Sequence, residues 1–101
     1  MARKGLLESN QRKKDLVQRY SDRRLKLKTM IMDKNLTLED RWEAVSKISK
    51  LPRSSSSVRI RNRCVLTGRP RGVYQFFELS RGPLRDMAVK GLLPGMRRSS
   101  W

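Results

Sequence analysis

The sequence predicts a mostly α-helical chain with extended and irregular parts. It would comprise an N-terminal helical pair, an arginine-rich loop, a short strand and turn, a C-terminal helix and a basic tail. Three observations lead to this prediction. Residues 7–31 contain good helix formers and neither Gly nor Pro. Residues 53–72 hold six arginines but no lysine and no acidic residue. Only 37% of the 101 residues are hydrophobic against a net charge of +16, so we expect a small core that a partner completes.

The first helix is expected over residues 7–31. An apolar stripe at helical spacing, interrupted by Arg23 and Arg24, is formed by Leu16, Tyr20, Leu27 and Ile31. Basic residues occur on nearly every face of this helix, which leaves little surface to bury against its own protein. We therefore expect it to lie between RNA segments, and the alternative is a solvated surface helix.

The second helix is expected to begin at Thr37 and to end before Pro52. Thr37 is an N-cap hydroxyl with the acid Asp40 three residues later, a variant of the capping box. An apolar stripe follows at helical spacing, made of Leu38, Trp42, Val45 and Ile48. We expect this stripe to pack against the first helix, with Trp42 in the core rather than stacked on a base.

The second half is expected to be less regular. Ser54 to Ser57 should be extended, residues 67–70 should form a turn, and residues 73–79 a short strand. Ser80 is the expected N-cap of a third helix that runs to Lys90, with a glycine stop after it. The residues expected to hold the turn by packing are Val73, Phe76, Phe77, Leu79 and Leu84. A basic, irregular tail follows.

The arginine-rich loop carries the strongest functional signal. Arg59, Arg61 and Arg63 alternate with uncharged residues, so an extended chain would present three guanidinium groups on one face. A planar guanidinium captures phosphate oxygens in pairs and stacks on bases, which an ammonium does less well. The loop therefore predicts a polyanionic partner, best matched by RNA. The alternative is a solvated basic loop that serves solubility.

Composition also limits the compartment and the chemistry. A single cysteine excludes an intramolecular disulfide framework, and no apolar run approaches the ~20 residues that cross a bilayer. We expect a reducing interior, either a bacterial cytoplasm or a mitochondrion or plastid, with a cleaved transit peptide as an open alternative. The sequence lacks histidine, a Gly-rich phosphate cradle and a carboxylate cluster, so it predicts neither an enzyme nor a cofactor or small-molecule substrate.

Several motifs together resemble one known family. They are Asp40-Arg41-Trp42, Leu51-Pro52-Arg53, Arg61-Asn62-Arg63-Cys64, Thr67-Gly68-Arg69-Pro70-Arg71, Phe77-Glu78-Leu79-Ser80-Arg81, Arg85, Leu93-Pro94-Gly95 and the ending Ser99-Ser100-Trp101. They closely resemble the ribosomal protein S-fourteen family of the small subunit, over nearly the whole chain. Gly82-Pro83 departs from the family pattern, which affects the expected start of the third helix.

The resemblance further implies the long, zinc-free form of that family. Cys64, Thr67, Ser80 and Pro83 follow the spacing of the four ligands of a zinc ribbon, but only Cys64 supplies a sulfur. Hydroxyls are poor zinc ligands and proline has no ligating group, so we expect a degenerate zinc-ribbon-like module without metal. Cys64 is then expected to be a small buried hydrophobic residue, with a reactive thiol as the alternative.

The resemblance implies a structural protein that binds 16S-type rRNA. It would contact the 3′ domain in the head of the small subunit, help its assembly and shape the decoding region. Its expected neighbours are small-subunit ribosomal proteins three, ten and nineteen. The alternative function is a free nucleic-acid-binding regulatory module; no recognition-helix motif supports a DNA-binding protein, and no clean amphipathic helix supports membrane binding.

Expected organisation and site residues follow from these arguments. Residues 1–52 would form a basic helical arm, and residues 53–101 an rRNA-binding module. The resemblance carries RNA contact over to Arg53, Arg61, Arg63, Arg69, Arg71, Arg81 and Arg85. The other predicted RNA-binding residues are Ser55, Arg59, Asn62, Thr67, Gly68, Pro70, Tyr74, Lys90, Arg97, Arg98 and Trp101. Tyr74 and Trp101 are candidates for stacking on a base, with a core position equally open for Tyr74.

Overall fold

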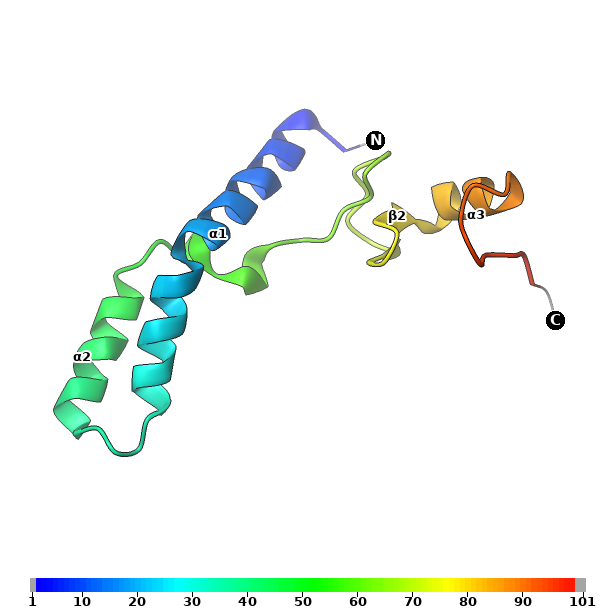
Figure 1. The fold of residues 1–101 in the computed structure, drawn as a ribbon. Coiled ribbons are helices and arrows are strands. Elements are labelled where there is room, and N and C mark those ends of the chain that lie inside the picture. Colours follow the sequence, from blue (N-terminus) through cyan, green and yellow to red (C-terminus); the bar gives the residue numbers. More distant parts are fainter. Residues whose placement is uncertain (1, 100–101) are drawn as a thin grey trace. The chain divides into compact units, whose positions relative to one another are not determined.

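The computed structural model describes residues 2–99, and its regular structure is mostly helical (Figure 1). The elements in chain order are α1 (Lys4–Met32), α2 (Leu38–Ser49), the 3-10 helices η1 (Arg53–Ser55) and η2 (Ser57–Arg59), the strands β1 (Val73–Tyr74) and β2 (Leu79–Ser80), and α3 (Arg81–Val89). This confirms the predicted mostly helical class with three α-helices, and it gives a pair of short strands where a single strand was expected. Within the described part, no helix has the length and apolar character that a membrane span needs.

The described residues form two compact units. Residues 8–60 make up the first, here called the hairpin unit, and residues 2–7 together with 61–99 make up the second, here called the loop unit. Residues 53–60 therefore group with the helices rather than with the rest of the arginine-rich segment. The functional division expected after residue 52 stays a prediction.

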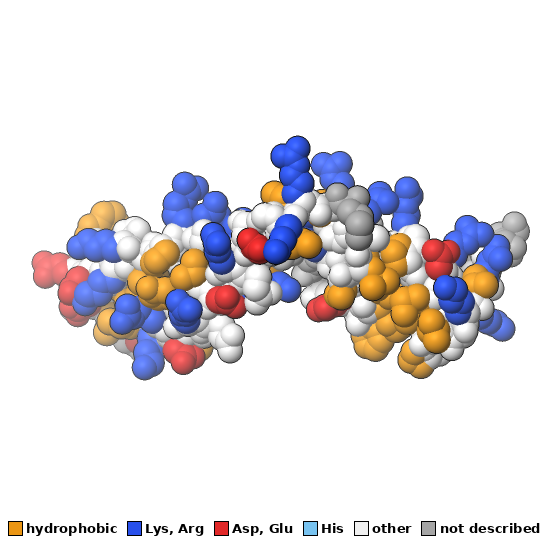
Figure 2. Space-filling model, turned by 90° about the horizontal axis from the view of Figure 1, so that it is seen from above, with side chains coloured by type: hydrophobic (Ala, Val, Ile, Leu, Met, Phe, Trp, Pro, Cys, Tyr) orange, Lys and Arg blue, Asp and Glu red, His pale blue; other side chains and the backbone are white. Residues whose placement is uncertain are grey.

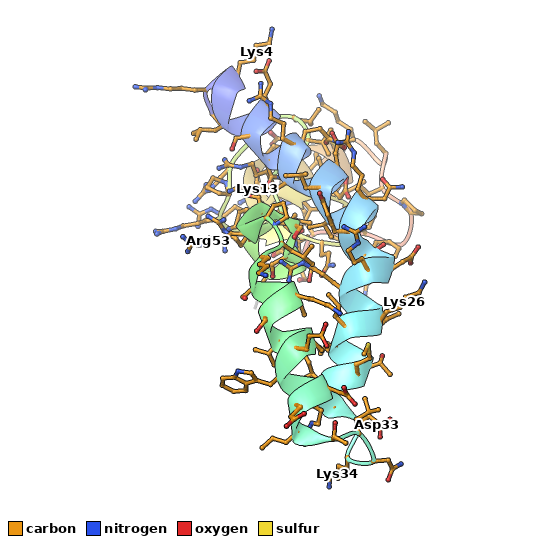
Figure 3. The ribbon with its side chains drawn as sticks, turned by 90° about the vertical axis from the view of Figure 1, so that its left-hand side faces the viewer. Lys4, Lys13, Lys26, Asp33, Lys34 and Arg53 are labelled. Carbon is orange, nitrogen blue, oxygen red and sulfur yellow. The ribbon has the colours of Figure 1, made fainter. Side chains whose placement is uncertain are left out.

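In the hairpin unit, α1 and α2 lie side by side and are joined by a short connection with a turn at Lys34 and Asn35 (Figure 3). The side chain of Thr37 accepts a hydrogen bond from the backbone N–H of Asp40 at 3.4 Å, which confirms the predicted cap. The predicted stripe on α1 is half-buried at each of its four positions. Arg24, expected to interrupt that stripe, is half-buried as well and belongs to it.

The packing face of α2 differs from the prediction. Ala44 is buried and Ile48 is half-buried, whereas Leu38 is 76% and Trp42 71% exposed. The expectation that Trp42 lies in the core is therefore wrong. At 3.6 residues per turn the Ala44–Ile48 edge lies about 100° around the helix from the larger stripe. Small Ala44 is therefore the buried residue of α2, and the larger apolar side chains lie on an exposed face of the helix.

Arginine side chains hold the hairpin unit together where apolar contacts are few. Arg24 donates from Nε to the Ser55 hydroxyl at 2.8 Å and from Nη2 to the Pro52 carbonyl at 3.2 Å. Arg41 on α2 donates from Nε to the Ile31 carbonyl at 2.9 Å, near the C-terminal end of α1 where carbonyls lack helical partners. The serine run, expected to be extended, instead forms η1 and η2, and Ser55 is buried at 1% exposure.

The core of the loop unit is a small cluster of buried Cys64, Leu79 and Leu84. Partly buried Val73, Phe77, Met87 and Leu93 pack against it. α3 ends as predicted, because Gly91 adopts φ +70° directly after the helix, in the left-handed region that glycine enters without strain. The expected packing of Val73, Phe77, Leu79 and Leu84 is confirmed.

The predicted continuous strand over residues 73–79 is wrong, because the chain reverses within it. β1 and β2 pair antiparallel, with Val73 opposite Ser80 and Tyr74 opposite Leu79. The reversal places Phe76 outside the core at 87% exposure, with its ring edge-on to Phe77 at 4.8 Å between centroids. Glu78 closes the turn at φ 53°, a left-handed conformation that sequence reasoning does not expect of glutamate.

The N-terminal residues pack on the turn that contains Gly68. The backbone N–H of Ala2 donates to the Thr67 carbonyl at 3.1 Å. Gly68 has φ +74°, and a Cβ added there would lie 2.8 Å from Ala2 Cβ and 3.0 Å from Leu7 Cδ2. Glycine at this position therefore satisfies both the backbone conformation and the close approach of the N-terminal segment.

Gly68→Ala is expected to destabilise the loop unit more than Gly72→Ala does. Gly72 also has a positive φ (+61°), but an added Cβ meets nothing within 4 Å, so its substitution costs only backbone strain of about 1–2 kcal/mol. At Gly68 the clash with Ala2 and Leu7 adds roughly 1–3 kcal/mol. Urea unfolding of the two full-length variants measures the difference. Equal losses would show that the N-terminal segment does not rest on this turn.

Ser55→Ala is expected to reduce the free energy of unfolding by about 1–3 kcal/mol, because it removes the acceptor of Arg24 Nε at a buried position. Ser57→Ala, at an exposed position in η2, is the matched control and should change it by less than about 0.5 kcal/mol. Thermal unfolding followed by circular dichroism compares the two. A control as damaging as Ser55→Ala would contradict the role given to this contact.

Candidate nucleic-acid interface

The predicted alternation of three arginines along an extended chain is only partly present. Arg59 lies in η2, where its Nη1 donates to the Ser54 hydroxyl at 3.4 Å. Arg61 and Arg63 lie in a segment without regular secondary structure. The expectation that all three extend one strand is therefore wrong, since the residues before Ile60 form a 3-10 turn.

Arg61 and Arg63 brace the following turn. Arg61 Nε donates to the Pro70 carbonyl and Arg63 Nη1 to the Gly68 carbonyl, each at 2.9 Å. Backbone bonds close the same loop, from Gly68 N to the Cys64 carbonyl at 2.8 Å and from Cys64 N to the Arg69 carbonyl at 3.0 Å. The braced turn presents exposed Arg69. Arg61 and Arg63 thus fix the backbone of the turn that carries Arg69.

Cys64, Thr67 and Ser80, three of the four positions with zinc-ribbon spacing, are connected by hydrogen bonds to the Cys64 sulfur. Cys64 is 2% exposed, which confirms its buried position. Burial alone raises the pKa of its thiol, but hydrogen bonds from the hydroxyls and backbone N–H groups of Ser80 and Thr67 outweigh burial and lower the pKa to about 6. Ser80 has N-cap backbone geometry, yet its side chain makes no capping bond to α3, so the predicted hydroxyl cap is wrong. Its hydroxyl bonds the sulfur instead.

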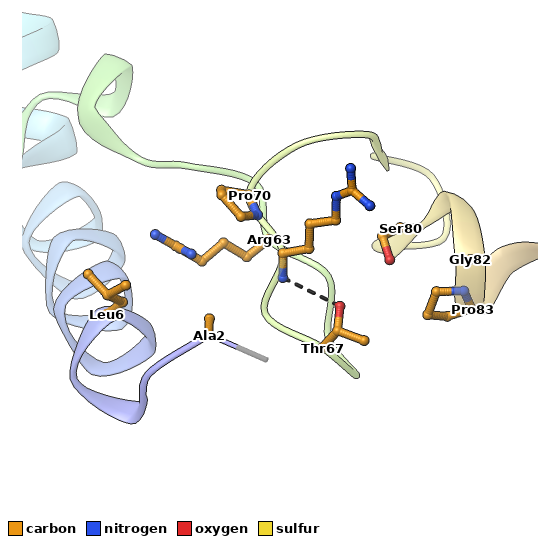
Figure 4. Close-up of a pocket in the computed structure, with 9 residues that line it drawn as sticks. Ala2, Leu6, Arg63, Thr67, Pro70, Ser80, Gly82 and Pro83 are labelled. Carbon is orange, nitrogen blue, oxygen red and sulfur yellow. Dashed lines mark hydrogen bonds between the residues drawn. The ribbon is translucent and has the colours of Figure 1, made fainter.

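The residues present do not fit a metal ion. Within residues 2–99 no group of three or more His, Cys, Asp or Glu side chains lies close enough to hold one. Thr67, Ser80 and Pro83 instead line a pocket of about 580 Å³ together with Ala2, Leu6, Arg63, Arg69, Pro70 and Gly82 (Figure 4). Arg63 Nε is buried here without a hydrogen-bond acceptor among the described residues. The similarity to a zinc ribbon stays a prediction.

The other predicted site residues divide by exposure. Exposed positions are Arg53, Asn62, Pro70, Arg71, Tyr74, Arg81, Arg85, Lys90, Arg97 and Arg98. Thr67 is half-buried, while Ser55 and Gly68 are buried, with the roles in packing described above. Arg81 and Arg85 lie one turn apart on α3. Trp101 lies outside the described residues. Binding of RNA by any of these residues stays a prediction.

Sequence reasoning missed some features of this surface. Phe76 is exposed, although the sequence predicts that it packs in the core. A four-residue reversal between Tyr74 and Leu79 had no glycine or proline to signal it. The carbonyl contacts of Arg61 and Arg63 have no sequence signal at all, because they depend on the closure of the turn.

Cys64 is expected to titrate with a midpoint near pH 6 in the folded chain, against about 8.5 in the unfolded chain. Since the folded-state pKa is the lower one, the thiolate stabilises the fold fully above about pH 8.5, and this is lost as the pH falls through 6. Thiolate absorbance at 240 nm, read with and without urea, measures both midpoints. The chain has no histidine to mask the transition, and Cys64→Ala is the blank. Equal midpoints would refute the assignment.

Comparison with known proteins gives the family. Residues 47–100 match the family model described as ribosomal protein S14p/S29e. The small ribosomal subunit protein uS14 of Wolbachia pipientis wMel is 51% identical over 102 residues, and that of Orientia tsutsugamushi (strain Ikeda) 50% over 101, with 100% of both chains covered in each case. The protein of the same name from Brucella anthropi is 46% identical over 101 residues, again with full coverage. The chain therefore belongs to the ribosomal protein S14p/S29e family.

Proposed function

We propose that this chain is a structural constituent of the small ribosomal subunit that binds 16S-type rRNA in the subunit head. The observation that carries the proposal is the braced turn: Arg61 and Arg63 fix the backbone of residues 68–70, and Arg69 and Arg71 are exposed on the loop it supports. A cation on a fixed backbone loses less conformational freedom when it binds a phosphate than one on a mobile loop does.

Electrostatics support RNA as the partner. The second half of the chain, residues 53–101, carries eleven basic and two acidic residues, and ten of the basic residues are arginine. Each phosphate neutralised by these groups releases counterions, which favours binding at moderate salt. Arg81 and Arg85 extend the cationic surface along α3, and exposed Tyr74 supplies a ring for stacking on an unpaired base.

The proposed setting follows from the family. The chain would lie in a bacterial-type ribosome, help assemble the head and shape the decoding region, next to ribosomal proteins three, ten and nineteen of the small subunit. The relatives that are named small ribosomal subunit proteins support this setting. The exposed, irregular residues 94–99 suit a tail whose backbone groups are satisfied by RNA. This role is structural rather than enzymatic.

The double variant Arg69→Ala/Arg71→Ala should weaken binding to small-subunit rRNA and lower its salt dependence. If each arginine holds one phosphate, the slope of log K against log salt concentration falls by about two. Equilibrium binding of the full-length chain to an rRNA fragment of the head, at several salt concentrations, gives this slope.

The matched control is Lys34→Ala/Lys47→Ala, which removes the same charge from two exposed positions of the hairpin unit. It should leave the slope nearly unchanged. If the two double variants lower the slope equally, binding depends on total charge rather than on the braced loop. An unchanged slope in both would contradict rRNA binding through residues 69 and 71.

A further inference from the structure

The end of the helical hairpin has a different charge from the rest of the chain. Residues 29–49, here called the hairpin end, contain three basic and four acidic residues, a net charge of −1. The remaining 80 residues contain 22 basic and five acidic residues, a net charge of +17. Salt screens charges beyond about 8–10 Å. The cations in the rest of the chain therefore do not attract phosphate groups to this end.

The hairpin end also exposes large apolar side chains. Leu38, Trp42 and Val45 recur at helical spacing on α2, and all three are exposed although α2 packs on α1 through another edge. Trp42 is the largest of them, with 71% of its surface exposed. An exposed tryptophan within an apolar stripe is the kind of side chain that dominates the binding energy of protein–protein interfaces.

Acidic side chains border this stripe along one side. Glu39 and Glu43 lie one turn apart, at about 100–140° around α2 from Leu38, and both are exposed. Lys47 bonds Glu43 at 2.7 Å and so neutralises part of this border, while Glu39 has no ion pair among the described residues. At the left of Figure 2, where the hairpin lies, red acidic and orange apolar side chains occur together.

A second apolar feature lies at the hairpin end, where α1 meets the connecting turn. Leu25, Lys26, Thr29, Met30, Asp33 and Leu36 line a pocket of about 500 Å³. Its apolar lining comes from Leu25, Met30 and Leu36, and it also holds one acidic and one basic side chain, Asp33 and Lys26. The pocket suits an apolar side chain of a partner.

We propose that the hairpin end, through Leu38, Trp42 and Val45, docks on a basic protein of the small subunit rather than on rRNA. The partner would present apolar side chains bordered by lysine or arginine, which complement the stripe and its glutamates. Phosphates would be repelled by Glu39 and Glu43 and would leave the stripe hydrated. The proposal rests on the proposed ribosomal function and assigns the two parts of the chain to different partners.

Photo-crosslinking from position 42 within assembled small subunits tests this. The full-length chain carries p-benzoyl-phenylalanine in place of Trp42, and sedimentation first establishes that it enters the subunit. After irradiation, mass spectrometry identifies the cross-linked molecule. The expected product is a ribosomal protein joined through a peptide of net positive charge. A cross-link to rRNA, to a second copy of the chain or to nothing would overturn the proposal.

The same label in place of Leu66 is the internal control. Leu66 is exposed on the turn between Arg63 and Arg69, where the proposed function requires rRNA. A cross-link from position 66 to rRNA, with none to protein from position 42, rejects this inference alone. A failure of position 66 to reach rRNA rejects the proposed function. If the label at Trp42 prevents entry into the subunit, the label at Leu38 replaces it.

A charge reversal at Glu39 distinguishes a protein partner from an RNA partner, because it changes the cross-link yield in opposite directions. Glu39→Lys, added to the chain labelled at position 42, should lower the yield of the protein cross-link by about two- to tenfold, because it places like charges in contact. Asp22→Lys makes the same change of charge on an exposed position of α1 outside the hairpin end and should leave the yield unaltered. On an RNA partner, Glu39→Lys would raise the yield instead.

Discussion

Hydrogen bonds from arginine side chains to backbone carbonyls supplement a small apolar core in this structure. Among the described residues the only buried apolar side chains are Ala44, Cys64, Leu79 and Leu84. The carbonyls of Pro52, Ile31, Pro70 and Gly68 each accept a bond from a guanidinium, donated by Arg24, Arg41, Arg61 and Arg63. The two partly buried bonds, from Arg41 and Arg63, each contribute about 1.5–3 kcal/mol, and the two exposed ones contribute less because water screens them. The same bonds give defined positions to side chains whose mutual repulsion opposes folding.

This use of arginine divides the cations into two groups with different functions. Those bonded to carbonyls fix the turn at residues 68–70 and the segment after α2, while Arg69, Arg71, Arg81 and Arg85 are exposed. In the proposed function the second group binds rRNA and the first group holds it in place. The hairpin end contributes Arg41 to the first group, but its exposed surface is acidic and apolar where the rest of the chain is basic. One chain would thus contact RNA with one part and protein with another.

The sequence predicted the features that depend on local physics. The helices, the Thr37 cap and the Gly91 stop follow from spacing and backbone preference alone. The residue pattern could not show whether the apolar stripe with Trp42 packs on α1 or on another molecule, because both kinds of packing require the same helical spacing. The turn at residues 75–78 closes through Glu78 in a left-handed conformation. No glycine occurs there to predict such a conformation from the sequence. Arg24 looked like a break in an apolar stripe because polarity patterns do not reveal a side chain that bonds a distant carbonyl. RNA contact at the site residues, and similarity to a zinc ribbon, remain predictions.

The central claim is that this chain is an integral part of the small subunit, held by arginines on a fixed backbone. Sedimentation of a tagged chain from its native lysate through a sucrose gradient, after a wash at high salt, tests this most directly. The account predicts that the chain stays with the small subunit through ~0.5 M salt, where loosely held charge contacts are lost. Recovery of the chain at the top of the gradient, or on DNA, would contradict it.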